Sequence, residues 1–292
     1  MNRHYTSKIA SAILAICLLC FATSCPSTKD SKETEQGEEA VISQTSPVSM
    51  PLNLSVYLDL SNRLTRQMTP SQSERDRAII KSLITTFMQR CQKDKAKECA
   101  NHLQVFFYPT PDDPQISKLA NDLDCDFGKM EVSDKIDAIN SMEKRYDAAL
   151  DQIYSATMQN KNWIGCDIWS FFSTNKIDHM CIRPGFRNVL VILTDGFIYH
   201  DNNVSKIDGT YTYIPANVQS SEHTLNVKRK GLSNLEVLVM EVNPMSPKQF
   251  QVLSDIWSNW LSGMEINHFE IVDTDLPKNN EQVITTFFQK QQ

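Results

Sequence analysis

The sequence predicts an α/β fold of three layers, with a mostly parallel sheet between two layers of helices. Short apolar segments alternate with amphipathic segments along most of residues 51–292, which is the pattern of βαβ units. The apolar segments are rich in Val, Ile and Leu and stop at polar residues, as strands buried on both faces do. About 240 residues predict one large domain, with two small domains as the alternative.

The elements follow from local patterns. The first helix begins at Ser71, because Glu74 three residues later completes a possible capping box and apolar residues then recur at helical spacing. Ser246 and Pro247 fit the N-cap and first position of a later helix. The other predicted helices are residues 135–159, a helix from 168 and residues 282–288. The predicted strands are residues 54–60, 102–108, 187–194, 235–242 and 268–272.

Two polar stretches interrupt this alternation. Residues 109–133 contain three prolines and the acidic run Asp122–Asp126. The run lacks the spacing and terminal glutamate of an EF-hand, so we expect an exposed insertion rather than a calcium site. Residues 197–231 are polar and partly strand-like. This excursion either shapes partner choice or is a solvent-facing hairpin.

The first residues have the pattern of an export leader. Arg3 and Lys8 precede a short apolar run, too short for a membrane span, and small residues lead into Cys25. This resembles a bacterial lipobox, which predicts a signal peptide over residues 1–24 and lipidation of Cys25; Cys20 is a poorer candidate. The alternative is an ordinary signal peptide cleaved nearby.

Residues 25–50 predict a disordered tether, because Ser, Thr, Lys, Glu, Gln and Pro dominate and no apolar period appears. Its acidic residues resemble the surface-export signals of Bacteroidetes lipoproteins, although an acidic linker needs no further purpose. We therefore expect a lipid-anchored protein of the bacterial cell envelope, on the periplasmic or surface face.

Charge and cysteines set further limits. Loss of Arg3 and Lys8 with the leader changes the formal net charge from −6 to −8, so nucleic acid is not an expected partner. No C-x-x-C motif indicates a zinc site. Cys166 and Cys181 flank a loop and are the expected disulfide pair. Cys91 and Cys99 are not expected to pair if one continuous helix carries both, about 12 Å apart.

Two apolar strands end in aspartates, and these residues are the candidate site. Asp59 and Ser61 follow the first strand, and Asp195 follows the strand at residues 187–194. Ligands of open α/β sheets bind beyond the carboxyl ends of the strands. Carboxylate and hydroxyl oxygens suit a hard cation such as Mg²⁺. The alternative is that both aspartates only cap the following backbone.

These residues resemble the metal-ion-dependent adhesion site of the von Willebrand factor type A (vWA) family. Asp59, Ser61 and Asp195 match three of its ligands, whereas Arg63 and Cys166 stand where serine and threonine are expected. Asp167 either joins the site or caps the helix from residue 168. The resemblance implies a Rossmann-like vWA fold, a degenerate site with Mg²⁺, another divalent ion or Arg63 in the cation position, and a protein partner.

The expected function is therefore protein–protein recognition with an unidentified envelope protein, without catalysis. No G-x-S-x-G, H-E-x-x-H or P-loop motif occurs. One alternative is a Mg²⁺-dependent phosphohydrolase that uses Asp59, although a D-x-D pair is missing. Another is a structural domain with a decayed site. Among scattered histidines, His200 is the one close to Asp195 in sequence.

Overall fold

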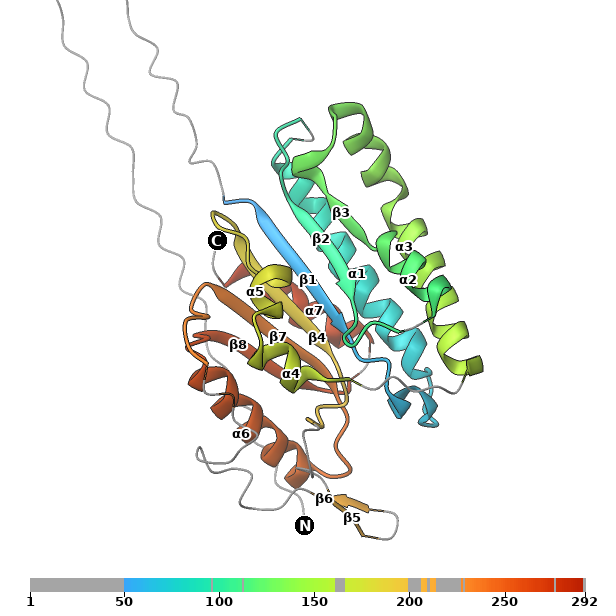
Figure 1. Cartoon of the computed structure of the whole chain (residues 1–292), viewed down its shortest axis with the longest axis vertical. Helices are drawn as coiled ribbons and strands as arrows, with labels where there is room; N and C mark the ends of the chain where they lie inside the picture. Colours follow the sequence, from blue (N-terminus) through green and yellow to red (C-terminus); the bar gives the residue numbers. More distant parts are fainter. Residues whose placement is uncertain are drawn as a thin grey trace, which may run out of the picture. The chain divides into compact units, whose positions relative to one another are not determined.

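A six-stranded sheet forms the centre of the domain (Figure 1). Its spatial order is β3-β2-β1-β4-β7-β8, and all neighbours are parallel except β2 and β3. The strands are β1 (Leu52–Leu58), β2 (His102–Phe106), β3 (Asp124–Asp126), β4 (Arg187–Leu193), β7 (Leu235–Val242) and β8 (His268–Asp273). The order reverses between β1 and β4, as in doubly wound Rossmann-like sheets.

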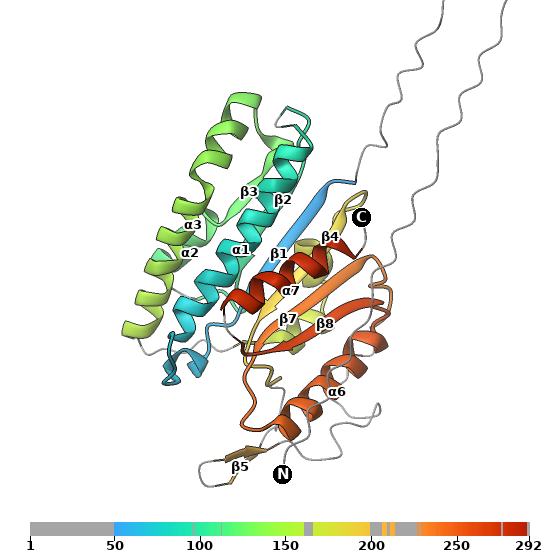
Figure 2. The same ribbon diagram turned by 180° about the vertical axis from the view of Figure 1, so that it is seen from behind.

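Helices cover both faces of this sheet, as the opposite views of Figures 1 and 2 show. One face carries α1 (Gln72–Lys93), α3 (Val132–Asn160) and α7 (Pro277–Gln289), and the other carries α4 (Ile168–Ser173), α5 (Lys176–Cys181) and α6 (Pro247–Gly263). The short helix α2 (Pro114–Asn121) packs against α3. The predicted three-layer α/β/α fold is therefore confirmed.

The computed structural model describes residues 50–95, 97–111, 113–160, 166–198, 206–208, 211–213, 227, 229–275 and 277–290. These belong to one compact unit. The predicted signal peptide, Cys25 and the tether up to residue 49 lie outside them, as does His200. Within the described part of the chain, no helix is both long and apolar enough to cross a membrane.

Alternating side chains of the strands build two cores. Leu54, Val56 and Leu58 of β1 pack under α1 and α3, while Tyr57 points to the opposite face. This period of two is the expected result of the pleat. Both faces of the central strands are buried, which explains why their sequences read as continuous apolar runs.

The prediction of an exposed insertion at residues 109–133 is wrong. This stretch contains α2, the edge strand β3 and a 3-10 turn η2 (Phe127–Lys129). Leu123, Cys125 and Phe127 are fully buried, and β3 runs antiparallel to β2. Apolar residues alternate with aspartates over residues 123–127, which is the signal of a half-buried strand, and the prolines and acidic charge obscured it.

The excursion at residues 197–231 lies mostly outside the described residues. Its described part includes a two-stranded antiparallel pair, β5 (Lys206–Asp208) and β6 (Tyr211–Tyr213). The strand character predicted near residue 211 is therefore confirmed. Whether the excursion shapes partner choice stays a prediction.

The predicted Cys166–Cys181 disulfide is wrong, and so is the continuous helix assumed for Cys91 and Cys99, although these two are also free thiols. Cys166 and Cys181 are free thiols. Cys166 contacts Tyr57 of β1, whereas Cys181 bonds to Ser55, which is also in β1. The expectation for Cys91 and Cys99 assumed one continuous helix. Helix α1 ends at Lys93, and the chain turns back so that both thiols contact the Asn101 side chain.

The capping box at the start of α1 is confirmed, and it gives a first test of the fold. The Ser71 hydroxyl accepts from the Glu74 amide, and the Glu74 carboxylate accepts from the Ser71 amide at 2.8 Å. We expect Ser71→Ala to lower the free energy of unfolding by about 1 kcal/mol in urea titrations. Thr85→Ala is the control, because Thr85 lies inside α1 and its hydroxyl bonds to the Lys81 carbonyl of the same helix; an equal loss there would contradict the capping role.

Candidate functional site

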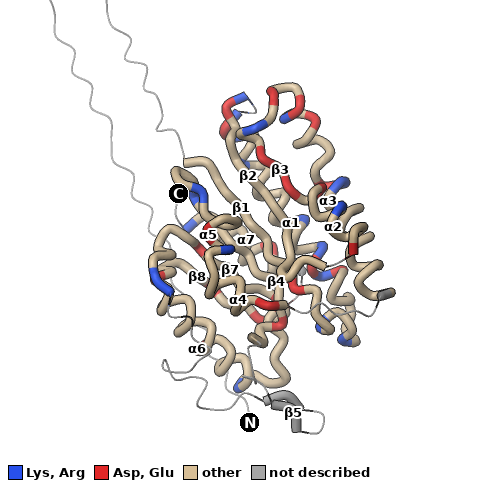
Figure 3. The backbone as a smooth tube through the Cα atoms, viewed as in Figure 1, with Lys and Arg blue, Asp and Glu red and all other residues tan. Residues whose placement is uncertain are grey.

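The site is formed where β1 and β4 end side by side. Leu58 pairs with Leu193, and the Asp59 amide donates to the Leu193 carbonyl at 3.0 Å. The following residues, Thr194 and Asp195, therefore leave the sheet next to Asp59. This is the edge at which the strand order reverses, the usual ligand position in such sheets. Figure 3 shows acidic backbone positions gathered near the carboxyl end of β4.

Asp59 is buried and ties the two strand ends together. Its side chain is 2% exposed. One carboxylate oxygen accepts from the Ser61 amide at 2.8 Å, and the other accepts from the Thr194 hydroxyl at 2.9 Å. Ser61 in turn caps the 3-10 turn η1 (Asn62–Thr65) by accepting from the Arg63 amide. Asp59 and Ser61 thus have structural roles at this edge.

Arg63 lies fully buried behind Asp59. Its Nε donates to the Asp59 carbonyl at 2.9 Å and lies 3.7 Å from the Asp59 carboxylate. Both terminal nitrogens donate to Asp76 of α1, at 3.3 and 2.6 Å, and the Tyr154 hydroxyl also donates to Asp76. Burial alone would lower the pKa of Arg63, but the carboxylates of Asp76 and Asp59 outweigh this effect, so the net pKa is raised. The guanidinium is therefore charged and held on two sides.

Asp195 pairs with a second arginine. Its carboxylate accepts from the Phe197 amide at 3.2 Å and from Arg66 Nη2 at 3.2 Å. Arg66 Nη1 also donates to the Asn243 carbonyl at 3.0 Å, and the Arg66 side chain is 38% exposed. Burial, together with the charge of Asp59, raises the pKa of Asp195 to about 6. Arg66 is thus an exposed cation fixed at the strand edge.

Gly196 allows Asp195 to turn toward this edge. Its φ is +89°, and a Cβ there would lie 2.8 Å from Val242 Cγ1. The Gly196 carbonyl accepts from Trp257 Nε1 of α6 at 2.9 Å. A glycine is needed here for both the backbone conformation and the close approach to β7.

Asp167 has the capping role that the sequence left open. Its carboxylate accepts from the Ser170 amide at 2.9 Å at the start of α4. The neighbouring Cys166 thiol donates to the Tyr57 hydroxyl at 3.5 Å. Burial, and the negative charge of Asp59, raise the pKa of Cys166. The side chain therefore stays a thiol, whereas the form that binds metals is the thiolate.

A second set of buried polar groups extends the site toward β8. Gln72 of α1 donates to both Asp76 and Glu241, at 3.0 and 3.1 Å. Arg75 forms two hydrogen bonds with the Glu241 carboxylate, which also accepts from Asn280. Glu241 has a φ of +66°, where the pairing of β7 with β8 is irregular. These contacts fix α1 and α7 to the end of β7.

The arrangement does not fit a divalent cation well. Asp59 faces Arg63, Asp195 faces Arg66, and the Asp167 carboxylate caps a helix. Among the residues that the structure describes, no group of three His, Cys, Asp or Glu side chains is placed to hold a metal ion. Two guanidinium groups lie beside the carboxylates of Asp59 and Asp195. These arginines are suited to neutralise the negative charge that a metal ion would otherwise balance.

Sequence reasoning brought Asp59, Ser61, Arg63 and Asp195 to the correct edge but missed their partners. Thr194 is adjacent to Asp195, and Arg66 lies three positions after Arg63, so both could have been included. Asp76 had a clearer signal: it lies three, four and seven positions before Ile79, Ile80 and Leu83, on the apolar face of the helix, where a lone carboxylate needs a buried partner.

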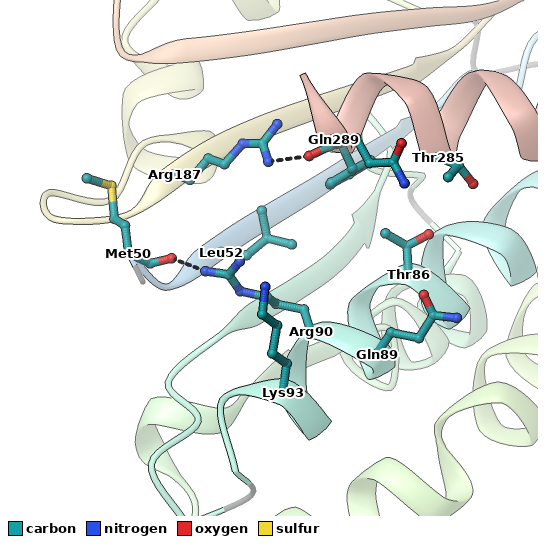
Figure 4. A pocket seen from close by; sticks show the side chains of 10 residues that line it. Met50, Leu52, Thr86, Gln89, Arg90, Lys93, Arg187, Thr285 and Gln289 are labelled. Atoms are coloured by element: carbon teal, nitrogen blue, oxygen red, sulfur yellow. Dashed lines mark hydrogen bonds between the residues drawn. The ribbon is translucent and has the colours of Figure 1, made fainter. Parts of the chain in front are cut away.

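A separate cavity lies at the opposite end of β1 (Figure 4). It has a volume of about 270 Å³, and Leu52 and Phe288 form its apolar part. Its arginines are already engaged, because Arg90 pairs with Asp94 and bonds to the Met50 carbonyl, and Arg187 forms two bonds with Glu236. The seven residues of β1, about 23 Å, separate this cavity from Asp59.

Comparisons with known proteins add little at this level of similarity. No protein-family model matches the chain, and no curated protein matches it. A crystal structure of an aerotolerance-related membrane protein from Bacteroides fragilis, with multiple mutations to serines, aligns with a TM-score of 0.43 and 13% identity. The alignment covers 82% of this chain and 99% of that chain. The fold assignment rests on the strand order itself.

The buried Arg63–Asp76 pair gives a test of the site's construction. We expect Arg63→Met to lower the free energy of unfolding by about 3–5 kcal/mol, because Asp76 would remain as an unpaired buried charge. Arg77→Met is the control, since the carboxylates that pair with Arg77 are more than half exposed and such pairs contribute about 0.2–1 kcal/mol. Equal losses in denaturant titrations would show that Arg63 is not an anchor.

The raised pKa of Asp195 predicts a pH dependence. The folded protein takes up this proton near pH 6, whereas an unfolded aspartate does so near pH 3.8. Wild type should therefore gain about 2–3 kcal/mol of stability relative to Asp195→Asn as the pH falls from 7 to 4. Denaturant titrations of both proteins across this range measure the difference, in which other groups cancel. A constant difference would contradict the shift.

Proposed function

We propose that the chain is a lipid-anchored cell-envelope protein whose vWA-like domain recognises another protein at the shared edge of β1 and β4. The observation that carries this proposal is Arg66, an exposed guanidinium fixed by Asp195 and the Asn243 carbonyl at the point where the strand order reverses. An acidic group of a partner is the ligand that this chemistry recognises.

Rigidity of the surroundings supports a recognition role. Arg66 uses one hydrogen bond from each terminal nitrogen within the described part of the chain, and a guanidinium has five N–H donors. Donors therefore remain for a carboxylate of the partner. The residues behind it, Asp59 and Arg63, are buried and hydrogen-bonded, so little ordering would be needed on binding.

We propose that guanidinium groups replace the divalent cation of the related adhesion sites. Arg63 lies against Asp59, and Arg66 against Asp195, so both carboxylates that follow the strands already have a cation beside them. A site with Mg²⁺ or another divalent ion is the alternative. It would require both arginines to withdraw from these carboxylates.

We also propose that the protein is not an enzyme. A nucleophilic aspartate needs an oxygen that can reach its substrate, but Asp59 is buried and both its oxygens accept hydrogen bonds. Within the described residues, the other carboxylates of this site bond to arginine or cap a helix. Asp59-dependent phosphatase activity with Mg²⁺ would contradict this proposal.

Photo-crosslinking in living cells tests the recognition edge. A photoreactive residue at Asn62, an exposed position in η1, should link the full-length protein to a defined partner. We expect Arg66→Glu to reduce this adduct at least tenfold, because the substitution reverses the charge that faces the partner. Arg77→Glu is the matched control and should leave the adduct unchanged, because Arg77 pairs with Asp147 and Asp151 of α3.

The same assay distinguishes a site in which arginine occupies the cation position from a site that binds a divalent metal ion. With guanidinium groups in the cation position, a chelator should leave the adduct intact, and millimolar Mg²⁺ or Mn²⁺ should leave the melting temperature unchanged. A metal site would instead give chelator-sensitive capture and a melting temperature that rises with metal concentration. An adduct equally strong in wild type and Arg66→Glu would reject recognition through Arg66.

A further inference from the structure

Two cysteines lie together at the amino end of the sheet, away from the recognition edge. Cys91 is in the last turn of α1 and Cys99 precedes β2. The Asn101 side-chain nitrogen lies 3.6 Å from Cys91 Sγ and 3.3 Å from Cys99 Sγ. Both cysteines are buried, at 0% and 1% exposure. One amide group thus contacts both sulfur atoms.

The backbone between them explains this approach. Helix α1 ends at Lys93, and Lys95 adopts a left-handed conformation with a φ of +57°. The amides of Glu98 and Cys99 then donate to the Lys95 carbonyl at 2.9 and 3.0 Å. This turn reverses the chain and returns Cys99 to the end of the helix. Lys135 Nζ holds the Cys99 carbonyl at 2.8 Å.

The two thiols also interact directly. A hydrogen bond from the Cys91 thiol lowers the pKa of Cys99 and raises that of Cys91. Thiolates attack disulfides and thiols do not, so the cysteine with the lowered pKa suits the first step of thiol–disulfide exchange. The turn between the two cysteines contains the exposed residues Lys95, Lys97 and Glu98.

We propose that Cys91 and Cys99 form an intramolecular disulfide when the protein meets a disulfide oxidant, such as a thiol oxidoreductase in its disulfide form or oxidised glutathione. The Cys99 thiolate attacks one sulfur of the oxidant and releases its other sulfur as a thiolate. Cys91 then loses its proton and attacks Cys99 Sγ, which breaks the mixed disulfide. Two electrons and two protons pass to the oxidant, which leaves as two thiols.

The bridge would join the end of α1 to the start of β2. Asn101 accepts from the Leu52 amide at 2.7 Å, so the bridge also lies beside the start of β1. Cross-linking a loop of this length stabilises a fold mainly by restricting the unfolded chain. The exchange therefore locks the amino end of the sheet, where the described part of the domain begins.

The other described cysteines have different surroundings and provide controls. Cys125 lies near Arg145, Cys166 bonds to Tyr57, and Cys181 bonds to Ser55. Burial raises the pKa of each of these three groups. They are therefore poor nucleophiles at neutral pH.

Peptide mapping tests the proposal. Trypsin cleaves after Arg90, Lys93, Lys97 and Lys118, so the bridge would link the peptides of residues 91–93 and 98–118. We expect this linked pair in full-length folded protein incubated with oxidised glutathione, and its loss after reduction. Oxidation should also raise the melting temperature. Cys91→Ser and Cys99→Ser should abolish both effects, whereas Cys181→Ser should retain them.

Three outcomes would overturn the proposal. The first is that both Cys91 and Cys99 still react with an alkylating agent when the oxidised protein is later unfolded, which would show that no disulfide had formed. A stable glutathione adduct on Cys99 without the linked peptides would show that Cys91 cannot complete the exchange. A bridge from either residue to another cysteine would assign a different pair. All three are read on wild-type protein, so they hold even if a serine variant fails to fold.

Discussion

The buried contact of Arg63 with Asp76 and Asp59 is the constraint on which the functional edge depends. A guanidinium without exposed surface is costly unless every side of it meets an acceptor. Here the acceptors come from α1 and from the end of β1. The contact therefore fixes the helix, the strand end and the turn η1 in one arrangement. An arginine at position 63 is compatible with the fold because Asp76 is present.

The charges of this edge nearly balance, and the imbalance falls on Asp195. Four carboxylates (Asp59, Asp76, Asp195 and Glu241) lie with three arginines (Arg63, Arg66 and Arg75). Asp195 is the one bonded to the partly exposed arginine, so it has the weakest compensation. Burial and the nearby Asp59 raise its pKa to about 6. Protonation of Asp195 as the pH falls would therefore weaken the Asp195–Arg66 contact.

Much of the fold could be predicted from the sequence, because central strands and amphipathic helices leave strong periodic signals. The edge strand β3 was missed, since three residues among prolines and aspartates give only a short alternation. At the site, Asp59 and Asp195 were predicted together from strand topology alone. Arg66 and Glu241 were not, because their roles depend on a turn and on an irregular strand pair. Such positions are set by tertiary contacts that no local pattern records.

The proposed recognition edge and the proposed disulfide lie at opposite ends of β1. At the carboxyl end, the Asp59 carboxylate joins β1 to the residue after β4, and the Asp59 carbonyl accepts from Arg63. At the amino end, Leu52 bonds to Asn101, which contacts both thiols. The strand between them is buried and paired on both sides, and packed cores resist continuous deformation. A bridge at the amino end would therefore raise the stability of the whole domain without moving Arg66, so that the proposed oxidation would leave the shape of the proposed recognition edge unchanged.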